Sequence, residues 1–205
     1  MLYGSDSATD GFQSGTTGER FYIGELGSVG SATTDYFNSS TADYANNNGG
    51  FVQGFWFLGS KPSGSSYTDE SWGAHMAQMA IAQVTSSAYS KYGIGLIYAD
   101  VEVGYWNGTT DENYATVKGF CNELSQQSYV PGIYSAPDAW TEICGSNSAQ
   151  AIAPGYGWSY EPQYTSSATI PSSFAPETFS DYNNEDIIMW QYYSSDSADY
   201  DAYVD

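Results

Sequence analysis

The chain has 205 residues, of which 41% are hydrophobic and 17% aromatic, and so many core-forming residues exclude a disordered protein. Four Lys and Arg residues stand against 24 Asp and Glu residues, which gives a formal net charge of −20. So few basic residues exclude nucleic-acid binding and disfavour anionic membrane surfaces, and they favour a neutral or cationic partner.

Three short apolar segments in the first part of the chain predict buried strands. They are Leu2–Asp6, Phe21–Gly24 and Phe51–Leu58. Between the second and third, Thr33–Ala45 carries apolar residues at helical spacing before an Asn- and Gly-rich stop. We therefore expect two strands, a helix and a third strand in this order.

The middle of the chain alternates helix and strand patterns. A long helix is predicted from Thr68 to a point before Gly93, with acidic residues in its first turn. Gly95–Val103 follows as the strongest strand pattern, because it is rich in β-branched residues and alternates in polarity. Thr109 and Glu112 then have the spacing of a capping box and predict the start of another helix.

The last third continues this alternation. We expect a strand at Val130–Tyr134, a short helix at Pro137–Cys144, a short strand at Ala151–Pro154, a long loop at Trp158–Glu177 and a final strand at Ile187–Tyr192. Such alternation is typical of an α/β protein with a parallel sheet. Seven or eight strands favour a single compact (β/α)8-type, TIM-like barrel domain over residues 1–205, with some helices degenerate or absent.

Two cysteines, Cys121 and Cys144, lie outside any CxxC pattern and have no adjacent histidine, so we expect no metal site. A disulfide between them is the first interpretation, and it would indicate an exported protein. Two buried free thiols are the alternative.

The polar surface must be built mainly from Ser, Thr, Asn, Gly and Tyr, which suit contact with sugars and indicate an extracellular protein. No run of 18 apolar residues is present, so we expect no membrane insertion. We also expect a monomer that needs no cofactor. Phosphate-binding loops, EF-hand loops and the zinc motif HExxH are absent from the sequence.

In parallel α/β folds the functional site lies at the carboxyl ends of the strands. Polar residues at the predicted strand ends are Asp6, Glu25, Asp100, Glu102, Ser135 and Gln191. Asp100 and Glu102 are two residues apart on one predicted strand, so both side chains should face the same side. Two carboxylates in one concave site repel each other, and one of them then holds a proton as a general acid.

A pair of this kind is the equipment of glycoside hydrolysis. The alternative is a solvated strand end without chemistry. Aromatic residues near the strand ends favour the first interpretation, because sugar C–H faces pack on rings. The candidates for substrate contact, each of which could instead be a core residue, are Tyr98, Tyr134, Trp158, Trp190 and Tyr192.

Six segments carry a resemblance that covers nearly the whole chain. They are YGSD, FYIGELGS, GFVQGFWFLG, IYADVE, YVPGIYSAPDAW, and IIMWQY with the later YVD. In this order they resemble the glycoside-hydrolase-like (β/α) barrels related to family 25 lysozymes, and most of all the secreted group described as DUF1906. The DVE strand with the downstream GIYS is the specific part.

The resemblance implies roles for four acids. Asp6 matches the acid that ends the first strand, Asp100 the carboxylate that orients the substrate acetamido group, Glu102 the general acid/base, and Asp205 the closing aspartate. It also implies hydrolysis of a β-1,4 bond in peptidoglycan or a related N-acetylated glycan, with the acetamido oxygen as the internal nucleophile. Glu102 would then be protonated and Asp100 charged.

One segment departs from the lysozyme pattern. FYIGELGS stands where the lysozymes carry K-A-[ST]-E-G, so Glu25 is the candidate to replace that glutamate as a substrate contact, together with Gln191 near the last strand end. The alternative function is a non-catalytic glycan-binding or structural surface protein on the same barrel.

Overall fold

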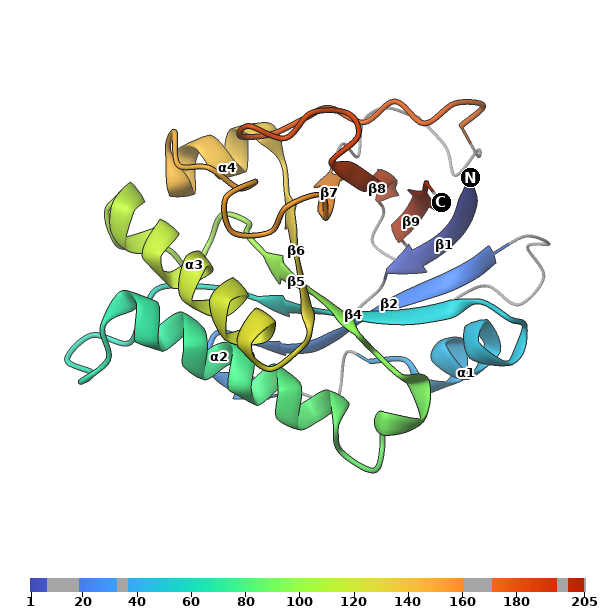
Figure 1. The fold of residues 1–205 in the computed structure, drawn as a ribbon, viewed down its shortest axis with the longest axis horizontal. Coiled ribbons are helices and arrows are strands. Elements are labelled where there is room, and N and C mark those ends of the chain that lie inside the picture. The colour runs from blue at the N-terminus through green and yellow to red at the C-terminus, as the bar shows by residue number, and fades with distance from the viewer. Residues whose placement is uncertain (7–18, 33–36, 161–170, 195–198, 205) are drawn as a thin grey trace.

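Eight strands close into a barrel in the computed structural model (Figure 1), which describes residues 1–6, 19–32, 37–160, 171–194 and 199–204. The strands are β1 (Leu2–Asp6), β2 (Glu19–Ser28), β3 (Ser31–Ala32), β4 (Phe51–Phe57), β5 (Leu96–Asp100), β6 (Val130–Ser135), β7 (Gly157–Tyr160), β8 (Ile187–Ser194) and β9 (Asp199–Tyr203). The α-helices in these ranges are α1 (Ser39–Asn47), α2 (Asp69–Val84), α3 (Thr110–Gln126) and α4 (Pro137–Cys144). This architecture confirms the predicted TIM-like barrel.

The order of strands around the barrel is β1-β9-β8-β7-β6-β5-β4-β2, and pairing of β1 with β2 closes the ring. β9 runs antiparallel to both of its neighbours, whereas the other pairs in the ring are parallel. The two-residue β3 only extends β2. Seven parallel strands therefore bring their carboxyl ends to one mouth of the barrel, and the start of β9 joins them there.

Side chains of the strands alternate between the barrel interior and the outer layer. On β5, Leu96 and Tyr98 belong to the interior cluster, whereas Ile97 and Ala99 belong to the larger cluster beneath the helices. Period-two alternation continues this pattern to Asp100, which faces the barrel mouth. Burying both faces explains why this strand is so apolar.

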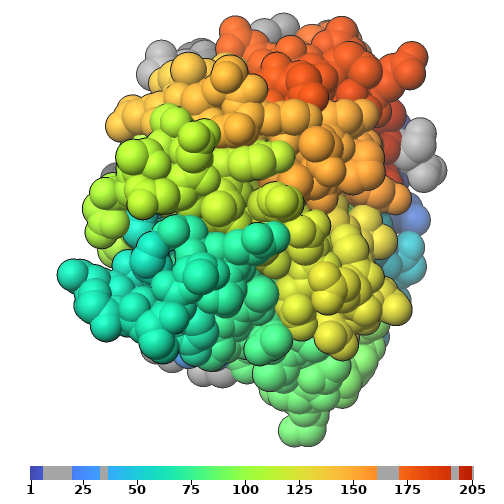
Figure 2. Space-filling view, turned by 60° about the vertical axis from the view of Figure 1, so that its left-hand side comes forward, coloured from blue at the N-terminus to red at the C-terminus, as the bar shows by residue number. Residues whose placement is uncertain are grey.

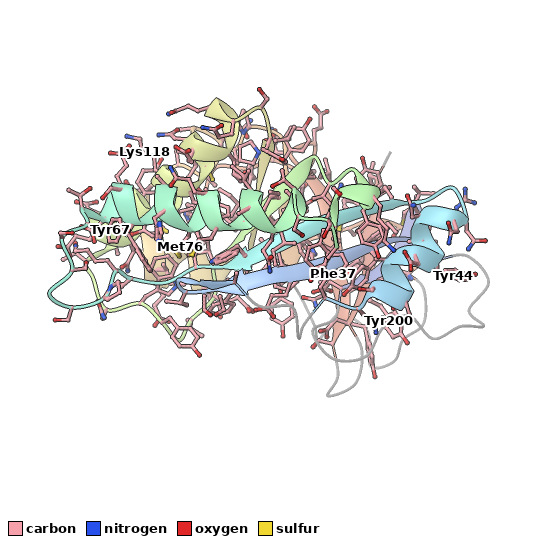
Figure 3. All side chains as sticks on the ribbon, turned by 90° about the horizontal axis from the view of Figure 1, so that it is seen from below. Phe37, Tyr44, Tyr67, Met76, Lys118 and Tyr200 are labelled. Atoms are coloured by element: carbon pink, nitrogen blue, oxygen red, sulfur yellow. The ribbon has the colours of Figure 1, made fainter. Side chains whose placement is uncertain are left out.

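The helices cover one side of the barrel, with α2 and α3 side by side on the face seen in Figure 2. Viewed from below, Met76 on α2 and Phe37 before α1 are buried in the layer between helices and strands, whereas Tyr44 is exposed on α1 (Figure 3). Asn38 caps α1 by accepting two backbone N–H groups, and the capping box of Thr109 and Glu112 opens α3 as predicted.

α2 and α3 cross at two glycines. A Cβ atom on Gly73 would lie 1.9 Å from the carbonyl oxygen of Thr116, and one on Gly119 would lie 1.9 Å from the carbonyl oxygen of Glu70. Both helix backbones therefore approach more closely than any side chain would allow.

None of the helices in the described ranges has the length and apolar character required to cross a bilayer.

Several predicted boundaries are corrected by the structure. The long helix ends at Val84, and only a 3-10 turn at Ser90–Tyr92 follows it. The predicted helix Thr33–Ala45 begins at Ser39, and residues 33–36 of that range lie outside the described residues. Strand β5 ends at Asp100 rather than Val103.

Two predictions in the last third are wrong. Ala151–Pro154 forms a turn, in which the N–H groups of Ile152 and Ala153 both donate to the carbonyl oxygen of Ala149. Strand β7 lies instead inside the segment predicted as a loop. The final strand of the barrel, β9, was not predicted, because its alternating acids and aromatic residues lack an apolar run.

The predicted disulfide is also wrong. Cys121 on α3 and Cys144 at the end of α4 are both buried free thiols in the outer core cluster. Burial raises the pKa of each thiol, so both stay protonated and behave as small apolar residues. The alternative of two buried free thiols holds.

Candidate active site

A pocket of about 270 Å³ opens at the carboxyl ends of the parallel strands. It is lined by Asp6, Glu25, Phe55, Phe57, Asp100, Glu102, Tyr134, Tyr160, Gln191, Ser194 and Asp199. Five of these side chains are acids and four are aromatic. Among the described residues, no Lys, Arg or His lines this pocket.

The acids Asp100 and Glu102 meet in this pocket as predicted, although only Asp100 belongs to β5. Glu102 lies two residues beyond the strand end, where its carbonyl oxygen accepts a hydrogen bond from Nε1 of Trp106 at 2.8 Å. This contact fixes the chain as it leaves the strand. The strand thus fixes one carboxyl group, and the anchored loop brings the second beside it.

Burial dominates the electrostatics of this pair. The side chain of Asp100 is 3% exposed, and its Oδ1 atom has no hydrogen-bond partner in the described structure. Burial, with the charges of Glu102 and Glu25, raises the pKa of Asp100 well above its usual range. Burial and the charge of Asp199 raise the pKa of Glu102.

A second group of carboxyls comes from the strands that close the barrel. Nε2 of Gln191 donates to Oδ1 of Asp6 at 3.1 Å, and the hydroxyl of Tyr134 donates to Oε1 of Gln191. Asp6 is also hydrogen-bonded to the carboxyl of Asp201, whose Oδ1 accepts from Nε1 of Trp158 at 2.9 Å. A chain of five buried side chains therefore runs from β6 through β8, β1 and β9 to β7.

The two buried carboxyls of this chain share a proton. Burial and the charge of Asp201 raise the pKa of Asp6, and burial raises the pKa of Asp201 to about 7. The hydrogen bond between the two carboxyl groups raises the pKa of Asp6 and lowers that of Asp201, so Asp6 is the partner that holds the proton. The pair therefore carries less than its full two negative charges at neutral pH.

Glu25 and Asp199 complete the acidic lining. Glu25, on β2, is 9% exposed, and burial raises its pKa to about 7. Asp199 begins β9 and lies opposite Asp6 in the β1–β9 register. We call Asp199, Asp6 and Glu25 the closing acids, because they come from the adjacent strands β9, β1 and β2 at the point of barrel closure.

The order of strands then fixes the layout of the mouth. Asp100 ends β5 and Glu102 follows it, and on one side Phe55 and Phe57 of β4 lie between these two acids and the strands of the closing acids. On the other side, the separation comes from the strands β6, β7 and β8 with Tyr134, Tyr160 and Gln191. The five acids thus share one pocket, in which the charge of Glu25 raises the pKa of Asp100 and the charge of Asp199 raises the pKa of Glu102.

The predicted aromatic contacts divide into three groups. Tyr134 lines the pocket. Tyr98 and Trp158 belong to the barrel interior and are almost completely buried. Trp190 and Tyr192 lie in a separate cluster outside the barrel, because Met189 and Gln191 take the inward positions of β8. These last two side chains do not line the pocket.

Of the other predicted residues, Asp6, Glu25 and Gln191 line the pocket, whereas Asp205 lies outside the described residues. Ser135 is fully buried, and its hydroxyl donates to the carbonyl oxygen of Val101 at 2.8 Å. Its place is structural.

Sequence reasoning missed a set of lining or supporting residues, namely Phe55, Phe57, Tyr160, Ser194, Asp199 and Asp201. A signal for the last two was present, because Asp199 and Asp201 repeat the two-residue spacing of Asp100 and Glu102. The last strand of the barrel therefore contributes Asp199 and Asp201 to the site.

The barrel with this acidic mouth has a lysozyme-like fold. The chain is similar in structure to a family GH25 lysozyme from Aspergillus fumigatus, with a TM-score of 0.66 and 18% sequence identity over 100% of this chain and 94% of the other. The catalytic domain of endolysin ply40 from bacteriophage P40 of Listeria monocytogenes gives a TM-score of 0.64 at 11% identity, over 100% and 93% of the two chains.

A third similar structure is the Tat-secreted protein Rv2525c of Mycobacterium tuberculosis, with a TM-score of 0.60 and 12% identity over 100% of this chain and 96% of the other. No protein-family model matches the sequence, and no curated protein matches it. The likeness is therefore one of fold.

Proposed function

We propose that the protein is an extracellular lysozyme-type glycoside hydrolase that cleaves β-1,4 bonds in peptidoglycan or a related N-acetylated glycan. The observation that carries this proposal is the meeting of Asp100 and Glu102 in one aromatic-walled pocket at the barrel mouth. The similar structures include lysozymes and endolysins, which supports the assignment. We also propose, from the sequence resemblance, that the chain is a member of the secreted glycoside-hydrolase-like group described as DUF1906.

In this mechanism Glu102 is the general acid/base. Its carboxyl group is less buried than that of Asp100, so it can reach the glycosidic oxygen of a sugar in the pocket. It gives its proton to the leaving oxygen as the acetamido oxygen of the same sugar attacks that sugar's anomeric carbon, and the bond to the leaving oxygen breaks. It then takes a proton from the water that opens the cyclic intermediate.

Asp100 orients the acetamido group and stabilises the charge that develops on it. Its unpartnered Oδ1 atom is an acceptor for the acetamido N–H. In the free protein the pKa of Asp100 is raised strongly, so the charged form needed in the reaction must be favoured by the bound sugar. A hydrogen bond from the acetamido N–H does this, because it stabilises the carboxylate.

The other lining groups would hold the glycan. Asp6 and Gln191 present fixed hydrogen-bonding groups, while Tyr134 and Tyr160 offer ring faces to sugar C–H groups. We propose that this protein acts as a monomer without a cofactor. Secretion is consistent with the fold, since one similar structure is described as a Tat-secreted protein.

Product analysis after incubation with peptidoglycan and chitooligosaccharides tests the proposal. Mass spectrometry should detect new reducing ends from the parent protein and from Glu142→Gln, which removes an exposed carboxylate on α4. Glu102→Gln should lower the rate by a factor of about 100 or more, because it removes the transferable proton. Equal turnover by Glu102→Gln and the parent would refute the role of Glu102.

A non-catalytic glycan-binding protein is the second candidate. It is favoured by one observation, namely that the pKa of Asp100 is raised while the described residues that line the pocket include no base to keep the carboxylate charged. Glycan binding without product, unchanged in Glu102→Gln, would establish this alternative.

A further inference from the structure

We propose that the closing acids form a subsite for the ammonium group of a de-N-acetylated hexosamine, so that the preferred glycan carries free amines beside its N-acetylated sugars. This inference rests on the proposed function in taking the ligand to be a glycan. It specifies in addition that the preferred glycan carries positive charge, which the roles of Asp100 and Glu102 do not determine.

The first support is the imbalance of charge around the pocket. Asp199, Asp6 and Glu25 come from three adjacent strands, and Asp201 lies behind Asp6 in the barrel interior. Asp6 accepts from the amide of Gln191 and Asp201 accepts from the indole of Trp158, and both of these donors are neutral. Carboxyl groups buried together without a counter-charge provide a site that a cation would complete.

The four basic residues of the chain are placed elsewhere. Lys61 pairs with Asp69, Lys91 pairs with Asp43, and Lys118 lies 3.9 Å from Glu70, all on the outer helices or their loops. Arg20 is the second residue of β2, at the end of the barrel opposite to the pocket. The cation must therefore come from the ligand.

The second support is the presence of unpartnered acidic atoms at or next to the cavity. Oδ1 of Asp100 and Oδ2 of Asp201 are buried and have no hydrogen-bond partner in the described structure. Glu25 is nine-tenths buried, lines the pocket and has a pKa raised by burial alone. Asp100 Oδ1 and Glu25 have lost hydration without gaining a protein partner in the described structure, which is the state that a bound ammonium donor would relieve.

The arrangement fits an organic cation better than a metal ion. Within the described ranges, no three Asp, Glu, His or Cys side chains converge closely enough to hold a metal ion. The acids instead surround a cavity of about 270 Å³ that also has Phe and Tyr walls. A hexosamine presents both an ammonium group and an apolar ring face, and so matches both parts of the lining.

The same charges disfavour an anionic glycan. A muramic acid carboxylate or an acidic stem peptide would enter a pocket of five acids on a chain with a net charge of −20. Repulsion of this kind lowers affinity and slows association. Among peptidoglycans and related N-acetylated glycans, the pocket therefore favours those that are partly de-N-acetylated.

Calorimetric binding to the Glu102→Gln variant tests this inference separately from catalysis. The probes are fully N-acetylated chitohexaose and partly de-N-acetylated chitohexaose, compared at pH 6.5, where amines of this type are mostly charged. We expect the partly de-N-acetylated oligomer to bind about tenfold more tightly, with a preference that weakens in high salt. Its binding should release protons, seen as a dependence of the heat on the buffer, because ammonium favours charged carboxylates.

Adding Glu25→Gln and Asp199→Asn to Glu102→Gln should abolish the preference, whereas adding the matched surface change Glu142→Gln should retain it. Folding is checked by the melting temperature, which should not fall for Glu25→Gln, because that change removes a buried negative charge. Equal affinity for the two oligomers, or a preference that survives the closing-acid changes, would overturn the inference. Competition by Ca²⁺ at matched ionic strength would overturn it in favour of a metal site.

Cleavage by the parent protein separates the two proposals. If the amine preference is found but neither oligomer is cleaved, the proposed catalytic function fails and the ammonium subsite stands. If chitohexaose is cleaved but no amine preference is found, the catalytic function stands and the subsite fails.

Discussion

Glu25 occupies a position where a carboxylate is costly. Its ordinary pKa is 4.5, and burial raises it to about 7, so the folded protein binds a proton there more tightly than the unfolded chain does. The cost of the charged form is therefore absent below about pH 4.5, grows through the range up to about pH 7, and is complete above it.

Replacing this carboxyl group should stabilise the protein only at high pH. We expect Glu25→Gln to raise the free energy of unfolding by about 1–2 kcal/mol at pH 8, a value reduced from the full shift because the pocket is open to solvent. At pH 4 the variant and the parent should be equal within error. Urea unfolding at both pH values measures this, and a loss of stability at pH 8 would contradict it.

The indole of Trp158 makes a hydrogen bond whose contribution can be isolated. Its Nε1 donates to Asp201, whereas Nε1 of Trp56, equally buried in the outer layer, has no partner in the described structure. Both Trp→Phe changes remove similar volume, but only Trp158→Phe leaves a buried carboxyl without its donor.

We therefore expect Trp158→Phe to cost about 1–2 kcal/mol more than Trp56→Phe at pH 8. The difference should shrink at pH 5, where Asp201 is protonated and depends less on the donor. Urea denaturation of the two variants provides the comparison. Equal losses at pH 8 would show that the hydrogen bond contributes nothing net.

For individual residues, the sequence predicted the site best where acidic side chains come at the end of an apolar strand. Asp100 and Glu102 stood out because they end a β-branched run, whereas Asp199 and Asp201 did not, because β9 has no such run. Trp190 and Tyr192 were misplaced for a related reason. Composition identifies β8 as a strand, but only the register with β7 and β9 determines which residues face inward.

Between elements, the closest packing is the crossing of α2 and α3 at Gly73 and Gly119. In an exposed helix, Gly→Ala stabilises by about 1 kcal/mol, so propensity alone predicts a gain at both positions. Here the added methyl group would meet a backbone carbonyl oxygen of the neighbouring helix. A gain in stability on Gly→Ala substitution would therefore indicate that helix propensity dominates, and a loss would indicate that the close approach of the helices dominates.

We expect Gly73→Ala to lower the free energy of unfolding by about 2–3 kcal/mol, because the helices must separate to accept the Cβ atom. Gly95→Ala is the matched control, since its Cβ would meet nothing closer than 4.0 Å. That variant should change stability by less than about 0.5 kcal/mol. Chemical denaturation followed by circular dichroism tests both, and a stabilised Gly73→Ala would refute the close approach.

Helices were easier to predict than the last strands. The capping box at Thr109 and the acidic first turn after Thr68 are local signals, so the starts of α2 and α3 were readable. Strand β7 has four residues and its neighbours supply its partners, so no local pattern defines it. Short strands in a closed ring are determined by pairing rather than by propensity.

For the whole molecule, the raised pKa values outweigh the lowered ones. Burial raises the pKa of a set of acids at the barrel mouth, namely Asp6, Glu25, Asp100, Glu102 and Asp201. Hydrogen bonds lower the pKa of three acids elsewhere, namely Asp43, Glu112 and Asp181. The folded protein therefore binds more protons than the unfolded chain between about pH 4 and pH 7.

The melting temperature should then rise by about 5–10 °C as the pH falls from 8 to 5, and fall again below about pH 4, where the three lowered acids lose their hydrogen-bonded charge. Differential scanning calorimetry across this range gives the test. High salt should leave most of the rise in place, because buried carboxyls are poorly screened. A steady fall in melting temperature from pH 8 to pH 5 would contradict this account.

Barrel closure has a kinetic consequence. Residues 2–6 pair with residues 199–203, so the last hydrogen bonds of the ring join segments separated by almost the whole chain. Such contacts carry a high loop-closure entropy and form slowly. The local helices and the strands β4, β5 and β6 can assemble earlier. At that stage the hydrogen bonds that join Asp6 on β1 to Gln191 on β8 and to Asp201 on β9 have not yet formed. On a ribosome the nascent chain would carry Asp100 and Glu102 long before the acids that complete the pocket, and activity would be the last property to appear.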